Sequence, residues 1–307
     1  RRIRSEEVSR VSRLTVVGAG YVGLVTAACM AELGHHIVAM DVDAAKIKML
    51  RQGGSPIYEP GLAELMTANR ERIEFTTDPV RAYTSGEFIF ICVDTPPTPS
   101  GDADRSRIWQ AVDNIPRENG QHVLIVKSTV PVGTGALVQA ELSQRGYGHI
   151  SYASNPEFLR EGSAISDFMH ADRVVVGADD PAVAARVAQL YEGVDSPVLT
   201  TDVASAEMIK YASNAFLATK ISFINEIANV CEVTGADVTV VAQGMGMDKR
   251  IGPHFLQAGI GYGGSCFPKD VKALKQIAGN SGYHFQLLNA VIEVNELQKR
   301  RVIGKLK

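Results

Sequence analysis

The chain has few cysteines and no closely spaced pair of them. Cys29, Cys92, Cys231 and Cys266 stand far apart, and none forms a Cys-x-x-Cys motif. Structural zinc sites and disulfide scaffolds both depend on clustered cysteines, so we expect neither, and no bound metal. Isolated thiols are typical of a reducing compartment, which predicts a cytoplasmic protein.

An excess of charge of either sign is also missing. The 307 residues carry 31 basic and 34 acidic side chains, a formal net charge of −3. This balance argues against nucleic acid or an anionic membrane as the main partner. It leaves room for a local basic pocket that binds a charged small molecule.

No internal repeat, heptad run or low-complexity tract is present, and only one stretch resembles a targeting segment. Residues 14–33 are almost uncharged and follow a basic start, as in a signal peptide or a short membrane span. Glycines at fixed spacing interrupt this stretch, and a strand pattern follows it. We therefore interpret it as a buried strand and helix, and residues 1–12 as a tail.

A dinucleotide-binding fingerprint fills that stretch. The apolar run Leu14–Val17 predicts a strand, and a helix is expected from the glycine motif to about Leu33. A second strand, His36–Met40, ends at Asp41, eighteen residues after the last glycine. The acid is placed to bind an adenosine ribose, which favours NAD over NADP. Lys46 either reaches the same ribose or is a solvated helix lysine. The motif itself reads Gly18-Ala19-Gly20-Tyr21-Val22-Gly23.

Alternation of strands and helices continues to about residue 201. Further strands are predicted at Phe88–Val93, Val123–Val126, Tyr152–Ser154 and Val174–Val176. The pattern predicts an α/β fold, a Rossmann-like doubly wound and mostly parallel sheet. Ser128 and Thr129 follow one of these strands. Their hydroxyls either point into a ligand cleft or cap the next helix.

The composition of the sequence changes at Asp202. Residues 202–232 contain no proline or glycine, start with an aspartate that can cap a helix, and predict a long spine helix. We expect an NAD-binding domain over 13–201 and an all-α central domain over 202–307 that can pack against another subunit. Lys210 and Asn214 share one face of the spine helix. The alternative is a surface ion pair between Glu207 and Lys210.

A glycine-rich stretch, residues 259–270, precedes a later helix. Its glycines let the backbone approach a ligand, and Pro268 suits the first turn of a helix. Cys266 would lie just before that helix, where the helix dipole favours a thiolate. Covalent catalysis by Cys266, with Asp270 nearby, is one interpretation. A turn that holds an inert buried cysteine is the other.

Together these motifs resemble the UDP-glucose/GDP-mannose dehydrogenase family over residues 13–307. The matching segments are Gly18–Gly23, Lys127–Thr134, Asn155–Gly162 and Gly261–Asp270. Segments Glu161–Ile165 and Gly264–Pro268 are most similar to the members that oxidise UDP-glucose. Members usually carry a further C-terminal domain that binds the nucleotide, so the resemblance implies a shortened chain that can lack activity.

The resemblance also implies a role for each matching residue. NAD would be bound by Gly18, Gly20, Tyr21, Val22, Gly23, Asp41, Lys46, Thr95, Thr129 and Glu161. Catalysis would use Cys266 as nucleophile, with Lys210, Asn214, Asp270, Thr129 and Glu157. The sugar nucleotide would contact Phe158, Leu159, Arg160, Lys210, Asn214, Arg250, Phe255, Leu256 and Gly263, with Arg250 reaching a neighbouring subunit's substrate in a homodimer.

The implied reaction is a four-electron oxidation with two NAD per turnover, UDP-glucose to UDP-glucuronate, through a thiohemiacetal and a thioester on Cys266. GDP-mannose and UDP-N-acetylhexosamine remain alternative substrates. Two further alternatives are a one-step hydroxyacid dehydrogenase, which needs no cysteine, and a non-catalytic NAD-binding or oligomerising module.

Overall fold

The computed structural model describes residues 11–116 and 120–305, which form two compact units. The first comprises residues 11–95, 104–116 and 120–210, and the second comprises residues 96–103 and 211–305. The short loop 96–103 was not expected to group with the helical part. The expected boundary between residues 201 and 202 stays a prediction, and most of the expected N-terminal tail lies outside the described residues.

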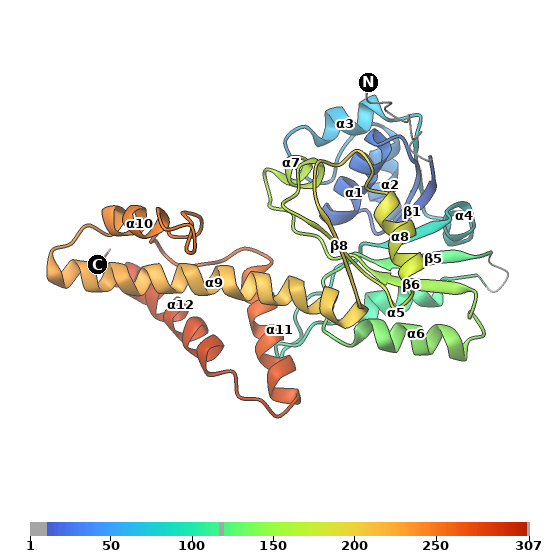
Figure 1. The fold of residues 1–307 in the computed structure, drawn as a ribbon. Coiled ribbons are helices and arrows are strands. Elements are labelled where there is room, and N and C mark those ends of the chain that lie inside the picture. Colours follow the sequence, from blue (N-terminus) through green and yellow to red (C-terminus); the bar gives the residue numbers. More distant parts are fainter. Residues whose placement is uncertain (1–10, 117–119, 306–307) are drawn as a thin grey trace, which may run out of the picture. The chain divides into compact units, whose positions relative to one another are not determined.

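The first unit is built on an eight-stranded sheet in the order β3-β2-β1-β4-β5-β6-β7-β8. Figure 1 labels β1, β5, β6 and β8 of this sheet. All neighbouring strands are parallel except β6 and β7. The predicted Rossmann-like, mostly parallel sheet is therefore confirmed. The strands are β1 (Arg13–Val17), β2 (His36–Met40), β3 (Ile73–Thr76), β4 (Phe88–Ile91), β5 (His122–Val126), β6 (Ile150–Ser154), β7 (Val174–Gly177) and β8 (Val198–Thr201).

Helices cover both faces of this sheet because the strand side chains are apolar on both faces. Leu14 and Val16 of β1 pack into one core, and Val17 packs into the other. The first core is closed by α1 (Tyr21–Glu32), α2 (Ala44–Arg51), α3 (Leu62–Ala68), α7 (Ala164–Met169) and α8 (Pro181–Gln189). The second is closed by α4 (Pro79–Ser85), α5 (Ser106–Asp113) and α6 (Thr134–Gln144).

Residues 14–33 form β1 and α1 rather than a membrane span, as the interrupted apolar pattern indicated. Across residues 11–116 and 120–305, every helix is too short or too polar to cross a bilayer. The segment between Ala44 and Ser85 received no prediction, yet it forms α2, α3, β3 and α4. Its elements are short, so their hydrophobic periods are weak.

The second unit is helical. The spine helix α9 (Val203–Thr234) begins at the capping residue Asp202 and continues into this unit, followed by α10 (Val238–Gly246), α11 (Phe267–Asn280) and α12 (Gln286–Lys305). Asp237 caps α10 through the Thr239 amide. Tyr211 and Ala218 of α9 pack against α11 and α12 residues in one core.

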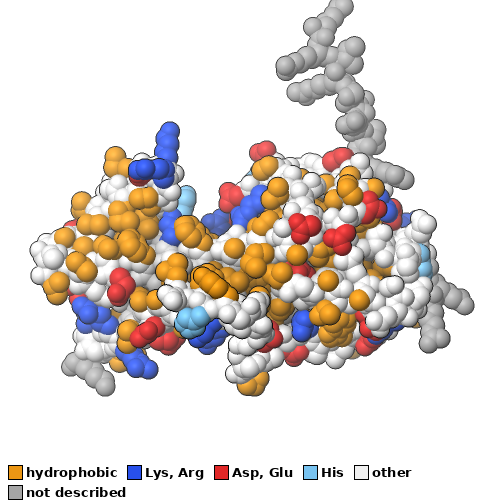
Figure 2. All heavy atoms as spheres, turned by 60° about the horizontal axis from the view of Figure 1, so that its bottom comes forward, with side chains coloured by type: hydrophobic (Ala, Val, Ile, Leu, Met, Phe, Trp, Pro, Cys, Tyr) orange, Lys and Arg blue, Asp and Glu red, His pale blue; other side chains and the backbone are white. Residues whose placement is uncertain are grey.

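Large apolar side chains remain exposed on the helical unit. None of the residues of α10 is buried, although the helix is rich in valine. Along α9, Phe216, Phe223 and Val230 are exposed at seven-residue spacing, so they lie on one face of the helix. In Figure 2 hydrophobic side chains gather over much of this unit's visible surface.

Candidate active site

The glycine fingerprint leaves space for a dinucleotide at the carboxyl end of β1. Gly18 has φ +100°, and a Cβ there would lie 2.7 Å from the Cys92 carbonyl oxygen. At Gly23 a Cβ would lie 1.8 Å from the Gly18 oxygen, so this glycine allows α1 to pack against the loop. A Cβ on Gly20 would meet only Asp94, at 3.8 Å. Open space therefore faces the N-terminus of α1, where a pyrophosphate fits.

Asp41, at the end of β2, is a buried carboxylate with several donors. Its oxygens accept from the Ala19 amide at 2.8 Å, the Asp43 amide at 3.0 Å and Lys46 Nζ at 2.7 Å. Burial raises the pKa of Asp41, but these donors outweigh it and hold the pKa below its ordinary value. The solvated-lysine interpretation of Lys46 is wrong, because its ammonium pairs with Asp41.

The ends of β4 and β5 are joined by hydroxyl groups. Thr95 Oγ1 donates to the Thr129 carbonyl oxygen at 2.8 Å, and Ser128 Oγ donates to the Val93 oxygen at 2.6 Å. The helix-cap interpretation of Ser128 and Thr129 is wrong, since the N-cap of α6 is Gly133. Thr95 is buried and Thr129 half-buried at the sheet edge where ligands bind in this fold.

Glu157 and Lys210 form a buried ion pair in the first unit. Lys210 Nζ lies 3.0 Å from Glu157 Oε1, and the Leu159 amide donates to Oε2 at 2.6 Å. The Phe158 ring lies 5.3 Å from Lys210 Nζ, close enough for a cation–π contact. A predicted acid/base group and a predicted cation are thus held together. Arg160 and Glu161, later in the same loop, are exposed, and Arg160 pairs with Asp167.

Lys210 does not pair with Glu207, so that alternative is wrong. Glu207 is buried and accepts from the Gly133 and Gly135 amides, each at 2.7 Å, at the start of α6. Burial raises the pKa of Glu207 to about 7, although the two amides favour its charged form. The carboxylate therefore ties the first turns of α9 to α6.

In the second unit, Cys266 is the N-cap residue of α11, and Pro268 lies in the first turn of that helix. Its thiol is exposed, so the interpretation as an inert buried cysteine is wrong. Asp270, one turn later, is buried and accepts from Asn214 Nδ2 at 2.6 Å and Lys269 Nζ at 2.8 Å. An accessible sulfur, a carboxylate and an amide are therefore brought to one helix end.

Buried amide side chains hold the glycine-rich stretch before Cys266, and sequence reasoning missed them. Asn295 Oδ1 accepts from the Tyr262 amide at 2.7 Å, and its Nδ2 donates to the Tyr262 oxygen at 3.1 Å. Asn225 accepts from the Gly259 amide, and Gln298 donates to the Gly259 oxygen, both at 2.8 Å. The only sequence signal for these contacts is a polar residue at a helix position where the apolar pattern predicts a core-facing side chain.

The remaining predicted substrate residues also lie in the second unit. Phe255 has φ +63°, a strained value for a bulky side chain, and its ring packs edge-on to Phe267 at 6.1 Å. Leu256 is buried and Gly263 exposed, while Arg250 is exposed and pairs with Asp248.

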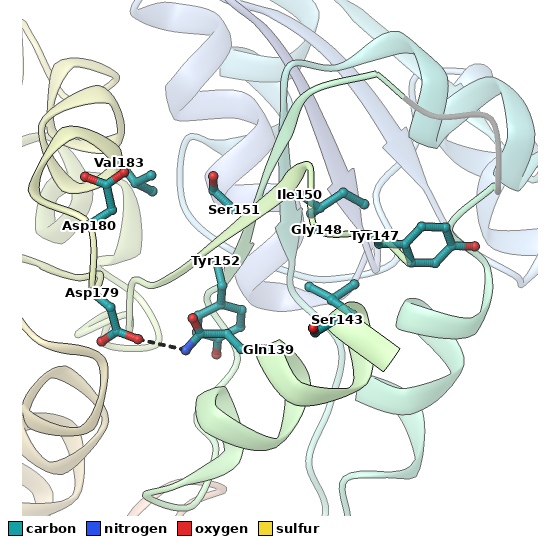
Figure 3. A pocket seen from close by; sticks show the side chains of 11 residues that line it. Gln139, Ser143, Tyr147, Gly148, Ile150, Ser151, Tyr152, Asp179, Asp180 and Val183 are labelled. Atoms are coloured by element: carbon teal, nitrogen blue, oxygen red, sulfur yellow. Dashed lines mark hydrogen bonds between the residues drawn. The ribbon is translucent and has the colours of Figure 1, made fainter. Parts of the chain in front are cut away.

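A cavity of about 210 Å³ in the first unit contains none of the predicted site residues (Figure 3). It lies at the amino-terminal end of β6, where Gln139 donates to Asp179 at 3.0 Å. The lining residues are Gln139, Leu142, Ser143, Tyr147, Gly148, Ile150, Ser151, Tyr152, Asp179, Asp180 and Val183. The predicted cofactor site is instead at the carboxyl ends of the strands.

Comparison with known proteins found that two domains of one protein family match this chain. Residues 12–195 match the NAD binding domain of the UDP-glucose/GDP-mannose dehydrogenase family, and residues 204–297 match the central domain of that family. Two curated relatives from Bacillus subtilis (strain 168), the UDP-glucose 6-dehydrogenases TuaD and YwqF, are 51% and 52% identical to this chain. The matches cover 96% and 95% of this chain but 65% and 68% of the relatives.

A solved structure supports the same assignment. The UDP-glucose dehydrogenase from the hyperthermophilic archaeon Pyrobaculum islandicum has a TM-score of 0.92 and 42% identity, and the match covers 95% of this chain and 70% of that one. The chain thus spans about two thirds of the length of the curated relatives that it matches.

Proposed function

Because the chain belongs to the UDP-glucose/GDP-mannose dehydrogenase family, we propose that it oxidises a nucleotide sugar to its uronate with two NAD per turnover. UDP-glucose is the proposed substrate and UDP-glucuronate the product, since relatives about half identical to this chain carry the name UDP-glucose 6-dehydrogenase. The observation that carries the proposal is the exposed Cys266 at the N-cap of α11, one turn from the buried Asp270.

NAD is the cofactor of the family's N-terminal domain, and the described residues fit it. The open space at Gly20 and the free first turn of α1 suit a pyrophosphate, and Asp41 with Lys46 suits the adenosine ribose. Tyr21 and Val22 complete this loop, and Thr95, Thr129 and Glu161 would lie toward the nicotinamide. When bound, NAD supplies a hydride acceptor.

The first oxidation converts the C6 alcohol to an aldehyde and releases one proton. Glu157 or a water held by Thr129 would accept that proton. Lys210 and Asn214, four residues apart on α9, would stabilise negative charge on the reacting oxygen. The buried Glu157 fixes the Lys210 ammonium for this role.

Cys266 would then trap the aldehyde. Its sulfur adds to the carbonyl carbon and gives a thiohemiacetal, which loses a second hydride and a proton to become a thioester. Water attacks the thioester carbon and the carbon–sulfur bond breaks. The uronic acid leaves, and a proton from the water restores the Cys266 thiol. Asp270, oriented by Asn214 and Lys269, would hold or activate this water.

The residues proposed to contact the sugar nucleotide are Phe158, Leu159 and Arg160, together with Phe255, Leu256 and Gly263. Lys210 and Asn214 would contact the sugar itself. GDP-mannose and UDP-N-acetylhexosamines remain substrates to compare with UDP-glucose, because the same alcohol oxidation applies to each of them.

We further propose a homodimer formed through the helical unit, with Arg250 reaching the partner's substrate. The exposed apolar face of α9 and the unburied α10 support such an interface, since clustered exposed apolar side chains mark interaction sites. A cytoplasmic location is proposed as well. It is supported by the four free cysteines, which suit a reducing compartment.

The deciding experiment measures NADH formed per uronate, with UDP-glucose, GDP-mannose and UDP-N-acetylglucosamine as separate substrates. A ratio of two NADH per acid is expected with UDP-glucose. One NADH per molecule of an aldehyde or keto product, with no uronate formed, would indicate a one-step dehydrogenase. NAD binding without turnover of any of these substrates would indicate a binding module.

A further inference from the structure

Glu59, in the turn before α3, is a buried carboxylate outside the predicted site, with 5% of its surface exposed. The Tyr21 hydroxyl donates to its Oε2 at 2.5 Å. The Gly162 amide donates to the same oxygen and the Ala164 amide donates to Oε1, both at 2.8 Å. One side chain therefore joins the first residue of α1 to the loop that precedes α7.

The contact is built for a charged carboxylate. Burial raises the pKa of Glu59, but the Tyr21 hydroxyl and the two backbone amides outweigh burial and hold the pKa below its ordinary value. Glu59 is thus ionised at neutral pH and accepts all three hydrogen bonds. Tyr21 also lies close to the loop directly, with its hydroxyl 3.3 Å from the Arg160 carbonyl oxygen.

The two joined segments have different duties in the proposed function. Residues 18–23 would bind NAD, whereas residues 157–160 include the Glu157 carboxylate that pairs with Lys210 and would provide substrate contacts. The loop between Arg160 and Ala164 has no regular secondary structure of its own until α7 begins. Its placement therefore depends on what its backbone amides contact.

We propose that Glu59 is a positioning residue that couples two segments, an inference that rests on the proposed function. The segments are the NAD loop, residues 18–23, and the substrate loop, residues 157–164, which contains both backbone amides that bond to Glu59. Binding of NAD against Gly18–Gly23 fixes Tyr21, and Tyr21 holds Glu59 and, through it, Gly162 and Ala164. The substrate loop is thereby held in place more firmly when the cofactor is bound.

The substitution Glu59→Gln tests the coupling with little change of shape. A glutamine oxygen can replace one carboxylate oxygen, but its NH₂ group then faces either the Gly162 amide or the Ala164 amide. Two donors cannot bond to each other, so one amide loses its partner whichever way the side chain is turned. The matched control is Glu64→Gln, the same change at an exposed position of α3.

We expect Glu59→Gln to raise both the Kd for NAD and the KM for the sugar nucleotide about tenfold, with a smaller fall in kcat, and Glu64→Gln to change none of them. A merely structural role would lower Tm and leave both constants of the folded enzyme unchanged. That result, measured by NAD calorimetry and initial rates, would overturn the proposal.

The double-mutant cycle with Tyr21→Phe isolates the link. Tyr21→Phe removes the contacts of the hydroxyl with Glu59 and with the Arg160 carbonyl oxygen. It leaves both backbone amides paired, so it tests the link even if Glu59→Gln does not fold. Alone it should raise the KM for the sugar nucleotide about threefold, and in the Glu59→Gln background it should add nothing. No KM change in Tyr21→Phe, or fully additive effects, would overturn the coupling. Failure of the wild-type protein to bind NAD or to oxidise any nucleotide sugar would instead refute the proposed function.

Discussion

Lys210 Nζ lies 3.0 Å from Glu157 Oε1, and the two side chains are only 5% and 8% exposed. Breaking such a pair leaves one charge buried without its partner, which costs about 3 kcal/mol or more. We expect Lys210→Met to lower the free energy of unfolding by that amount and to abolish turnover. Adding Glu157→Gln should restore most of the stability but none of the activity.

Urea denaturation and initial rates test this pair. The control is the exposed pair of Arg81 and Glu74, where Glu74→Gln should cost less than about 1 kcal/mol. Stability losses that simply add in the double variant would show that Lys210 and Glu157 act independently.

The covalent route depends on Cys266. Cys266→Ser replaces the sulfur by a weaker nucleophile, so uronate formation should fall at least about 10³-fold, while NAD affinity stays unchanged. Quenched-flow product analysis and calorimetry measure the two quantities. Cys231→Ala, at a buried cysteine of the same unit, should retain activity. Uronate production by Cys266→Ser at the normal steady-state rate would exclude the thioester.

Glu207 predicts a pH dependence of stability. Its folded pKa is raised from 4.5 to about 7 by burial, so the folded protein binds the proton more tightly than the unfolded chain does. The associated stability is fully present below pH 4.5 and is lost as the pH rises to about 7. Between these values the wild-type protein should lose on the order of 3 kcal/mol relative to Glu207→Gln.

Denaturant titrations from pH 4.5 to 8 check this sign. The loss should be absent from Glu207→Gln and present in Glu64→Gln, whose substituted carboxylate is exposed. Parallel stability curves for wild type and Glu207→Gln would mean that Glu207 titrates normally.

The sequence predicted those features whose causes are local. Glycine spacing and the acid after β2 indicated the NAD loop, and Asp202 was recognised as a helix cap because a cap acts within three residues. The N-cap position of Cys266 followed from Pro268 in the same way.

Features that depend on distant partners could not be predicted. Glu59 contacts amides 103 and 105 residues away, and Asn295 contacts Tyr262 at a separation of 33. A surface ion pair of Glu207 with Lys210, three residues later, was one alternative, but the partners of Glu207 are amides more than 70 residues away. Hydrophobic periodicity in the sequence does not indicate such pairings, because they form only when the helices and strands pack together.

The exposed apolar face of α9 predicts that a single substitution can dissociate the proposed homodimer. A negative charge at Phe223, between Phe216 and Val230, would have to be buried at the interface. We expect Phe223→Asp to shift the dimer toward monomer by at least about tenfold in Kd, measured by sedimentation equilibrium. Tyr58→Asp, at an exposed aromatic residue of the first unit, should leave the association unchanged. A monomeric wild-type protein would contradict the proposed interface.

A shared site predicts complementation between two inactive variants. If Arg250 serves the partner's substrate, Arg250→Ala and Cys266→Ser impair different halves of each site. After subunit exchange, half of the dimers are mixed, and each mixed dimer has one site with both an intact cysteine and an intact arginine. Mixing should therefore restore about a quarter of wild-type activity, whereas neither variant alone recovers any. Rates measured before and after exchange distinguish this result from independent subunits, which would gain no activity on mixing.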